Sequence, residues 1–296
     1  MDSLNELRRR IARLAHGTQG PSWTEGIVAL SADGPTIELG TVTEPVFALV
    51  AQGTKHSVLG DRVFDYRAGQ YLVVTIDLPL ISQITQASPD EPFLAFGLPL
   101  NPHTIAELLL EASPPPKRPE ADVAIATSDA DTDLIDAVVR LLRLLEKPDD
   151  FRVLAPAVMR EIHWRLLTGL QGGLVRQAGL ADSRLTTVAR AARWLQTHYD
   201  QAIRMDDLAS HVGLSVPSLN RHFRAVTALS PLQYQKQIRL QKARMLLMAA
   251  PHDVAAAGHA VGYDSPSQFS REYRRMFGTP PSQDAEHLQT TATIKA

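Results

Sequence analysis

The chain has 296 residues, 44% of them hydrophobic and 21% charged, which is the composition of an ordinary globular protein long enough for two domains. It contains no cysteine, which excludes disulfide scaffolds, thiol chemistry, Cys-ligated zinc and iron–sulfur centres. The N-terminus lacks the apolar core of a secretory signal, and no segment is apolar over the length needed to cross a membrane. We therefore expect a cytoplasmic protein with no membrane partner.

The charge is unevenly distributed along the chain. Residues 181–280 carry 13 Lys/Arg and 7 Asp/Glu, whereas all other residues together carry 17 basic and 25 acidic side chains. The net charge of −2 therefore combines a basic C-terminal region with an acidic remainder. Such a basic region is typical of a domain that meets a polyanion, and it is also found in solvated helical domains.

The chain is expected to begin with a short helix. In residues 1–16, Leu4, Leu7, Ile11 and Leu14 recur at spacings of three and four, which places them on one helical face.

Residues 36–100 have the pattern of closely spaced strands. The segments 45–53 and 68–79 are apolar and β-branched, and a Gly-Asp turn divides residues 55–66 into two strands. The runs ISQITQAS and PFLAFGLPL complete the set. Strands joined by tight turns predict a small barrel or sandwich.

A proline-rich segment separates these strands from helices. Residues 111–122 hold four prolines within six positions and predict a loop. Helices are expected at 131–147 and at 156–170, the second with Pro156 near its first turn and ending at the QGG of 171–173. Residues 131–147 are apolar on more than one face, which indicates burial either within the chain or against a second subunit.

From about residue 183 the chain is expected to be helical with short turns. Prolines and glycines mark most of the helix boundaries. The expected helices lie near 184–199, 205–212, 216–227, 231–249, 253–260 and 265–277.

This C-terminal region contains an internal near-repeat at an offset of 49 to 50 residues. Each copy has a short apolar helix that ends at a glycine, then a serine suited to cap a second helix, as expected for a helix-turn-helix. The matched positions are Val212, Gly213, Leu214, Leu219, Arg221 and Phe223 in one copy, and Val261, Gly262, Tyr263, Phe269, Arg271 and Tyr273 in the other. Two aligned copies favour paired DNA-binding units over a helical bundle with a solvated basic face.

The second helix of each copy carries polar side chains opposite its buried face. Arg can bind guanine bidentately, Asn and Gln can bind adenine, and Ser can bind bases or phosphates. We expect base-edge contacts from Asn220, Arg221, Gln268 and Arg271. Ser218, Arg224, Ser267, Arg274 and Arg275 are expected to position the protein on phosphates, and Ser270 lies on the same face.

A helix over 231–249 would join the two copies. Its 19 residues would span roughly 28 Å, since an α-helix rises 1.5 Å per residue. A rigid spacer of that length could hold two DNA-contacting helices about one turn of DNA apart, near 34 Å.

Residues 186–284 resemble the DNA-binding domain of AraC/XylS-type transcription regulators. The segments LASHVGLS, LSPLQYQKQIRLQKARMLL and VGYDSPSQFSREYRRMFGTPP carry the resemblance. Two departures are Ala228, where the family usually has glycine, and Gly258, where alanine is usual and where glycine should loosen the helix by roughly 1 kcal/mol. Neither lies on the expected DNA-facing side.

Residues 20–180 are similar to the cupin-like N-terminal module of one AraC subfamily, through PVFALVAQGTKHSVLGDRVFDYRAGQYLVVTIDLPL, PFLAFGLPL and PAVMREIHWRLLTG. The resemblance implies an α+β chain: residues 1–180 form a small β-barrel with flanking helices that senses an effector and dimerises. Residues 181–296 form an all-α domain with two helix-turn-helix units joined by a long helix.

The expected function is therefore sequence-specific binding of double-stranded promoter or operator DNA by a transcription regulator. The expected partners are a small-molecule effector of unknown identity, a second copy of the chain and, for an activator, RNA polymerase. Candidate effector-binding residues on the barrel strands are Phe47, Leu49, His56, Tyr71, Val73 and Phe96.

Two other functions compete with this interpretation. One is a cupin-type metalloenzyme, but the barrel region holds only His56 and His103 and has no His-x-His pair. The other is a purely structural or protein-interaction module. We expect no catalytic residues, no metal and no cofactor.

Overall fold

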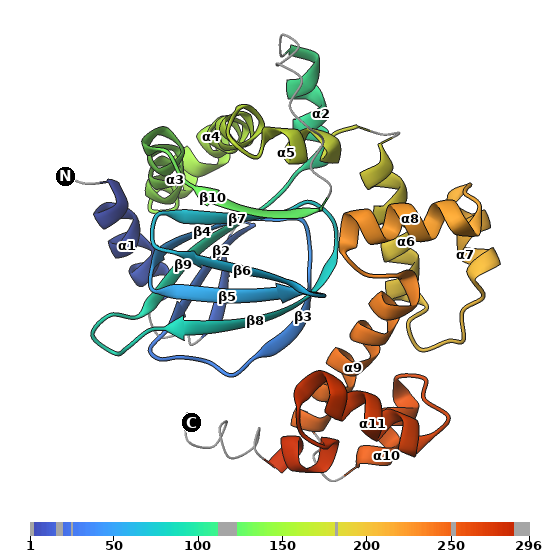
Figure 1. Ribbon diagram of the computed structural model, residues 1–296. Coiled ribbons are helices and arrows are strands. Elements are labelled where there is room, and N and C mark those ends of the chain that lie inside the picture. Colours follow the sequence, from blue (N-terminus) through green and yellow to red (C-terminus); the bar gives the residue numbers. More distant parts are fainter. Residues whose placement is uncertain are drawn as a thin grey trace. The chain divides into compact units, whose positions relative to one another are not determined.

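A computed structural model describes residues 3–15, 20–24, 26–111, 123–180, 183–249 and 253–286. The chain divides into two compact units, the first comprising Met1–Ala189 with Ala225–Ala228 and the second comprising Arg190–Arg224 with Leu229–Ala296 (Figure 1). Most of the expected proline-rich loop, residues 112–122, lies outside the described residues.

The first unit contains a six-stranded and a four-stranded antiparallel sheet. The six-stranded sheet has the order β1-β2-β9-β4-β7-β10, and the four-stranded sheet has the order β3-β8-β5-β6. The strands are β1 (Gly20–Thr24), β2 (Ile27–Ala32), β3 (Leu39–Thr43), β4 (Val46–Gln52), β5 (Thr54–Leu59), β6 (Arg62–Arg67), β7 (Gln70–Val74), β8 (Leu78–Gln86), β9 (Phe93–Pro99) and β10 (Ile125–Asp129).

Two glycines allow the chain to turn at the ends of β5. Gly53 lies between β4 and β5 with a φ of +81°, and a Cβ there would stand 2.5 Å from the carbonyl oxygen of Gln86. Gly60 and Asp61 form the two-residue turn between β5 and β6, and this turn sets the pairing of Leu59 with Arg62. The predicted turn between residues 55 and 66 is thereby confirmed.

Helices cover one face of the six-stranded sheet (Figure 1). Side chains of β4, β7 and β9 and of these helices share one continuous apolar core. The helices are α1 (Ser3–Leu14), α2 (Pro102–Glu111), α3 (Thr132–Leu144), α4 (Pro148–Thr168) and α5 (Gly172–Ala178). The expected N-terminal helix is confirmed as α1, and its Leu7 and Ile11 are fully buried in this core.

One detail of the helical layer differs from expectation, and a second agrees with one of the two alternatives left open. Helix α4 begins at Pro148, so Pro156 lies inside the helix rather than in its first turn. Pro148 suits the first helical position because its missing N–H would have no partner there. Helix α3 packs against α1 and α4, so its apolar faces are buried within the chain.

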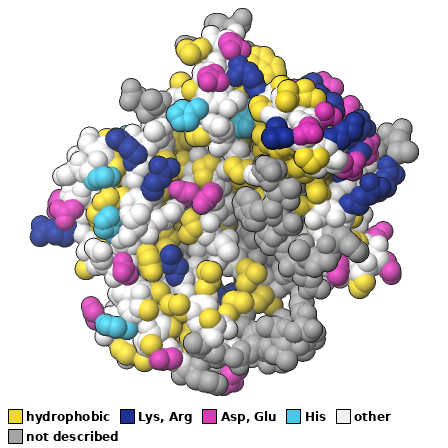
Figure 2. Space-filling model, turned by 180° about the vertical axis from the view of Figure 1, so that it is seen from behind, with side chains coloured by type: hydrophobic (Ala, Val, Ile, Leu, Met, Phe, Trp, Pro, Cys, Tyr) yellow, Lys and Arg dark blue, Asp and Glu magenta, His cyan; other side chains and the backbone are white. Residues whose placement is uncertain are grey.

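Ion pairs fasten α1 to α3 on the outside of this layer. The guanidinium of Arg143 donates to both carboxylate oxygens of Glu6, at 2.8 and 2.5 Å, and Arg10 donates to the same carboxylate at 2.8 Å. These donors lower the pKa of Glu6 to about 2. Figure 2 shows basic and acidic side chains intermixed on the outer surface of these helices, at upper right.

The second unit is helical and contains the internal repeat. Its helices are α6 (Arg184–Thr197, from Arg190 onward in this unit), α7 (Met205–Val212), α8 (Val216–Thr227, up to Arg224 in this unit), α9 (Pro231–Ala249), α10 (Val254–Ala260) and α11 (Pro266–Phe277). These bounds confirm the helices expected from the sequence to within two residues. The α+β class, with a β-module followed by two helix-turn-helix units, is likewise confirmed.

Candidate nucleic-acid interface and internal cavity

The first helix-turn-helix is formed by α7 and α8. Helix α7 ends at Gly213, whose φ of 73° is left-handed, and the hydroxyl of Ser215 accepts a hydrogen bond from the backbone N–H of Ser218 at 3.4 Å. Leu219 and Phe223 are fully buried. The Phe223 ring meets the ring of Tyr234 on α9 edge-to-face at 5.3 Å, which fixes how α8 lies on α9.

The second helix-turn-helix, α10 and α11, repeats this construction. Gly262 takes a φ of 84° in the turn, and the Ser265 hydroxyl caps α11 by accepting from the backbone N–H of Gln268. Phe269 and Tyr273 are buried on the inner side of α11. Because the inner sides are alike in both copies, the outer sides carry equivalent positions.

Five of the expected DNA-contacting side chains are exposed arginines: Arg221, Arg224, Arg271, Arg274 and Arg275. Within the described residues, none of these guanidinium groups has an ion-pair partner, whereas arginines of the first unit such as Arg143 and Arg165 are paired with carboxylates. An unpaired, solvated arginine retains all its donors for a phosphate or a base.

The five expected uncharged contact residues differ in exposure. Ser267 and Gln268 are exposed, whereas Ser218, Asn220 and Ser270 are partly buried. The Asn220 amide donates to the Val216 carbonyl oxygen of its own helix at 3.1 Å, and the Gln268 amide donates to Glu272 at 3.3 Å. Each of these bonds uses one N–H of the amide group, so the second N–H and the amide oxygen of both side chains remain to contact a base.

A polar joint, formed by the side chains of Gln235 and Arg239 on α9, links the end of α6 to the turn of the second helix-turn-helix. Arg239 on α9 donates to the carbonyl oxygens of Tyr199, Gln201 and Gly262 at 2.5, 2.9 and 2.9 Å. Gln235, one turn earlier, donates to the first two of these oxygens. This joint holds the second helix-turn-helix against the helix that precedes the first.

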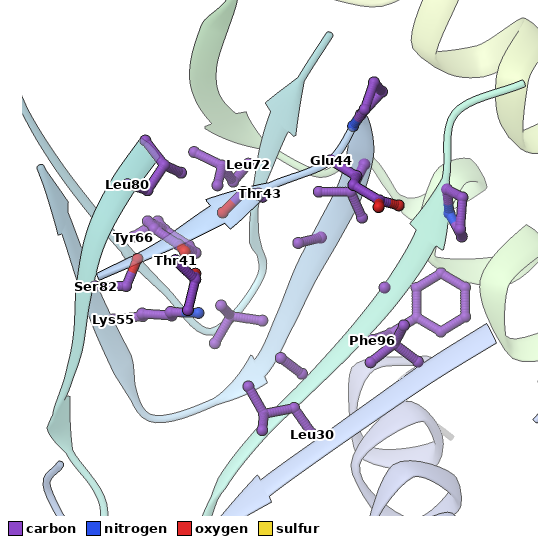
Figure 3. Close-up of a pocket in the computed structure, with 18 of the residues that line it drawn as sticks. Leu30, Thr41, Thr43, Glu44, Lys55, Tyr66, Leu72, Leu80, Ser82 and Phe96 are labelled. Carbon is purple, nitrogen blue, oxygen red and sulfur yellow. The ribbon is translucent and has the colours of Figure 1, made fainter. Parts of the chain in front are cut away.

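The β-module contains a partly open cavity of about 440 Å³, shown in Figure 3. The six-stranded sheet contributes an apolar wall that includes Val46, Ala48, Val50, Leu72 and Phe93. The four-stranded sheet contributes Thr41, Lys55, Tyr66, Leu80 and Ser82. A cavity of this volume with few polar groups suits a small molecule.

Of the six expected effector-binding residues, only Phe96 lines this cavity. Side chains alternate between the two faces of a strand, so a one-residue difference decides which face each side chain occupies. Phe47, Leu49, Tyr71 and Val73 lie on the helix-covered face, in the core shared with α1, α3 and α4.

The remaining candidate, His56, does not line the cavity either. Its Nδ1 lies 2.7 Å from an Asp65 carboxylate oxygen on the neighbouring strand. His56 alternates with Lys55 and Ser57, which face inward, so its position is that of an outward-facing side chain.

Sequence reasoning missed Lys55, Tyr66 and Ser82. The two-residue turn at Gly60 and Asp61 fixes the hairpin register and therefore pairs Lys55 with Tyr66. That pairing could have been found from the sequence, but the face that points inward could not.

Two searches of the described residues bear on other functions. No three His, Cys, Asp or Glu side chains in the described ranges lie close enough to hold a metal ion. None of the described helices combines the length and apolarity that a membrane span requires.

A hollow β-module joined in one chain to paired helix-turn-helix units is typical of regulators that bind a small molecule and DNA through separate parts. Residues 24–174 match the family model for the AraC-type transcriptional regulator N-terminus, and residues 208–287 match a helix-turn-helix domain. The chain therefore belongs to the AraC-type transcriptional regulators.

Its curated relatives include the transcriptional activator RhaS of Salmonella agona, 31% identical over 151 residues, or 50% of this chain and 53% of RhaS. The regulator ArgR of Pseudomonas aeruginosa is 30% identical over 152 residues, or 50% of this chain and 45% of ArgR. The chain thus matches these relatives over about half their length.

A solved structure with a similar fold is ToxT from Vibrio cholerae bound to an unsaturated fatty acid. Its TM-score is 0.53, and the alignment covers 88% of this chain and 93% of ToxT. The sequences are 8% identical, so the likeness is one of fold.

Proposed function

We propose that this protein binds promoter or operator DNA sequence-specifically and regulates transcription in response to a small molecule held in the β-module. The observation that carries the proposal is the pair of helix-turn-helix units, each with exposed arginines that lack an ion-pair partner among the described residues. Such side chains neutralise phosphates and contact base edges. ToxT, which is similar in fold, has been solved with a fatty acid, which supports a small-molecule effector here.

Helices α8 and α11 would enter successive major grooves, held apart by α9. Helix α9 has 19 residues, and its length of roughly 28 Å is close to the ~34 Å repeat of DNA. Base contacts would come from Asn220, Arg221, Gln268 and Arg271. Phosphate contacts would come from Ser218, Arg224, Ser267, Arg274 and Arg275, with Ser270 beside them.

The two functions would be divided along the chain. Residues 1–180 would sense the effector and dimerise, and residues 181–296 would bind DNA. Residues 181 and 182, which follow this boundary, lie outside the described ranges. The protein would act in the cytoplasm as a homodimer, would contact RNA polymerase if it activates, and would catalyse no reaction. Effector binding would shift the population of DNA-binding-competent conformations.

The test is binding of the full chain to DNA from upstream of its own gene, at rising salt concentration. Neutralised phosphates release counterions, so the logarithm of the affinity should fall linearly with the logarithm of salt. The double variant Arg221→Ala, Arg271→Ala should lose the preference for this DNA, whereas Arg152→Ala, at an exposed arginine of the first unit, should not. Absence of salt-sensitive binding in the wild type would overturn the proposal, and metal-dependent turnover would favour a cupin-type enzyme.

A further inference from the structure

The cavity of the β-module is chemically two-sided. The wall from β4, β7 and β9 presents only apolar groups, among them Val46, Ala48, Leu72 and Ala95. The opposite wall, from β3, β5, β6 and β8, presents hydroxyl groups and the ammonium of Lys55. A ligand that fits both walls needs an apolar body and a polar head.

Lys55 faces into the cavity as a consequence of strand alternation. It lies two residues before Ser57, which is fully buried, and both therefore occupy the inner face of β5. Its cross-strand partner is Tyr66, and Ser57 is the partner of Ser82 on β8. Figure 3 shows Lys55, Tyr66, Thr41 and Ser82 together on one side of the cavity.

A short chain of hydroxyl groups holds this polar corner in place. The Ser57 hydroxyl lies 3.3 Å from the Tyr66 hydroxyl and 2.9 Å from the Ser82 hydroxyl. Because the buried Ser57 hydroxyl contacts both groups, the hydroxyls of Tyr66 and Ser82 are held in position before any ligand binds. Pre-positioned donors reduce the ordering cost of binding.

The Lys55 ammonium has no carboxylate partner within the described part of the chain, although it is partly buried. Glu44 also lines the cavity, but it is exposed and lies away from Lys55 in Figure 3. A partly desolvated cation beside a tyrosine hydroxyl favours an oxyanion that accepts from both groups.

We propose that the effector is a carboxylate with an apolar body, whose carboxylate group is bound by Lys55 and Tyr66 and whose body lies against the wall of β4 and β9. The ammonium has three donors and the Tyr66 hydroxyl one, and the four lone-pair sites of a carboxylate can accept them. An amine would place a like charge beside Lys55, and an alcohol would leave its charge uncompensated. This proposal specifies the ligand class of the proposed function and rests on it.

The test is calorimetric titration of the full chain with decanoate, decanol and decylamine. Decanoate should bind at least tenfold more tightly than decanol, and decylamine should not bind measurably. Lys55→Met should remove the preference for decanoate, Lys55→Arg should retain most of it because the charge remains, and Tyr66→Phe should weaken decanoate binding severalfold. Lys147→Met, at an exposed lysine on the outside of the helical layer, is the matched control and should behave as wild type.

Equal binding of decanoate and decanol to the wild type, or an undiminished preference in Lys55→Met, would overturn this inference. The Arg and Phe variants keep it falsifiable if the Met variant fails to fold, which thermal melting would report. DNA binding of the wild-type chain separates the two proposals. A wild type that binds DNA but does not prefer decanoate to decanol contradicts the ligand class alone, and a wild type that does not bind DNA contradicts the proposed function.

Discussion

The guanidinium of Arg239 donates to the carbonyl oxygen of Gly262 at 2.9 Å, and this contact connects helix α9 to the turn of the second helix-turn-helix. The same guanidinium holds the backbone of Tyr199 and Gln201 at the end of α6. It also lies 5.7 Å from the centre of the Tyr263 ring. One side chain thus joins three segments of the second unit.

Replacing Arg239 with Ala should destabilise the second unit and impair DNA binding. The change leaves carbonyl oxygens without their charged donor, and such losses cost roughly 1.5–3 kcal/mol. Arg239→Lys should recover little, because an ammonium does not reproduce the planar fork. Urea titration measures the stability change. Lys242→Ala on the same helix, where the ammonium lies 4.3 Å from the Tyr199 ring, is the control and should cost less than about 1 kcal/mol.

The turn glycines of the two copies should differ sharply in their tolerance of alanine. A Cβ on Gly262 would stand 1.9 Å from the carbonyl oxygen of Asp200, so Gly262→Ala should cost about 3 kcal/mol or more. Gly213 has a similar φ but no atom within 4 Å of that position, so Gly213→Ala should cost only about 1–2 kcal/mol of backbone strain. Denaturant midpoints give the comparison. Equal losses would mean that the close approach at Asp200 does not exist.

Ala228 should be a site where glycine stabilises the protein. It is the only non-glycine residue with positive φ among those described, at 59°. Left-handed backbone costs an L-residue roughly 1–2 kcal/mol, so Ala228→Gly should raise stability by about 1 kcal/mol. Ala225→Gly, inside α8, should lower stability by about 1 kcal/mol. A loss of stability in both variants would argue against the left-handed turn.

His163 should make the stability of the first unit depend on pH. Its Nε2 accepts from the Asn101 backbone N–H at 3.0 Å and its Nδ1 donates to the Met159 carbonyl oxygen at 2.7 Å, so the folded state holds the neutral ring. Burial lowers the pKa of His163 below its usual value. The unfolded chain takes up a proton near pH 6.5 that the folded chain does not, so this contribution is present above that pH and lost as pH falls below it.

The expected loss is at most about 1.4 kcal/mol per pH unit, the limit for one proton. His163→Gln should flatten the dependence of stability on pH between 7 and 5 relative to wild type, measured by urea titration at each pH. His103→Gln, at an exposed histidine of α2, should leave the slope unchanged. An identical slope in the His163 variant would show that another group titrates in this range.

The helices of the second unit were predictable because local signals agree there. Glycines, capping serines and prolines mark most of the helix ends, and buried aromatic side chains recur at helical spacing on α8 and α11. Gly258 shows the limit of this reasoning. Besides its low helix propensity, Gly258 makes room for Phe269, whose ring lies 2.9 Å from where a Cβ would be. Only the fold reveals that contact.

The cavity was harder to predict because its residues depend on which strand faces point inward. On β4, Phe47 and Leu49 lie in the helix-covered core, while Val46 and Ala48 line the cavity. All four side chains are apolar, because this strand is buried on both faces. Hydrophobicity therefore does not show which side chains face the cavity and which face the helices. Lys55 gives no sequence signal for the cavity, because a lone lysine in a hairpin is usually solvated.

The most direct test of the central claim compares Arg271→Ala with Arg274→Ala by fluorescence anisotropy, on DNA from upstream of the gene and on a scrambled duplex across a salt series. If α11 lies in a major groove, Arg271→Ala should weaken binding to the upstream DNA by about 1–3 kcal/mol while leaving scrambled DNA nearly unaffected. Arg274→Ala should weaken both equally and reduce the salt slope by about one. Equal losses on both duplexes for Arg271→Ala would contradict base recognition by this helix.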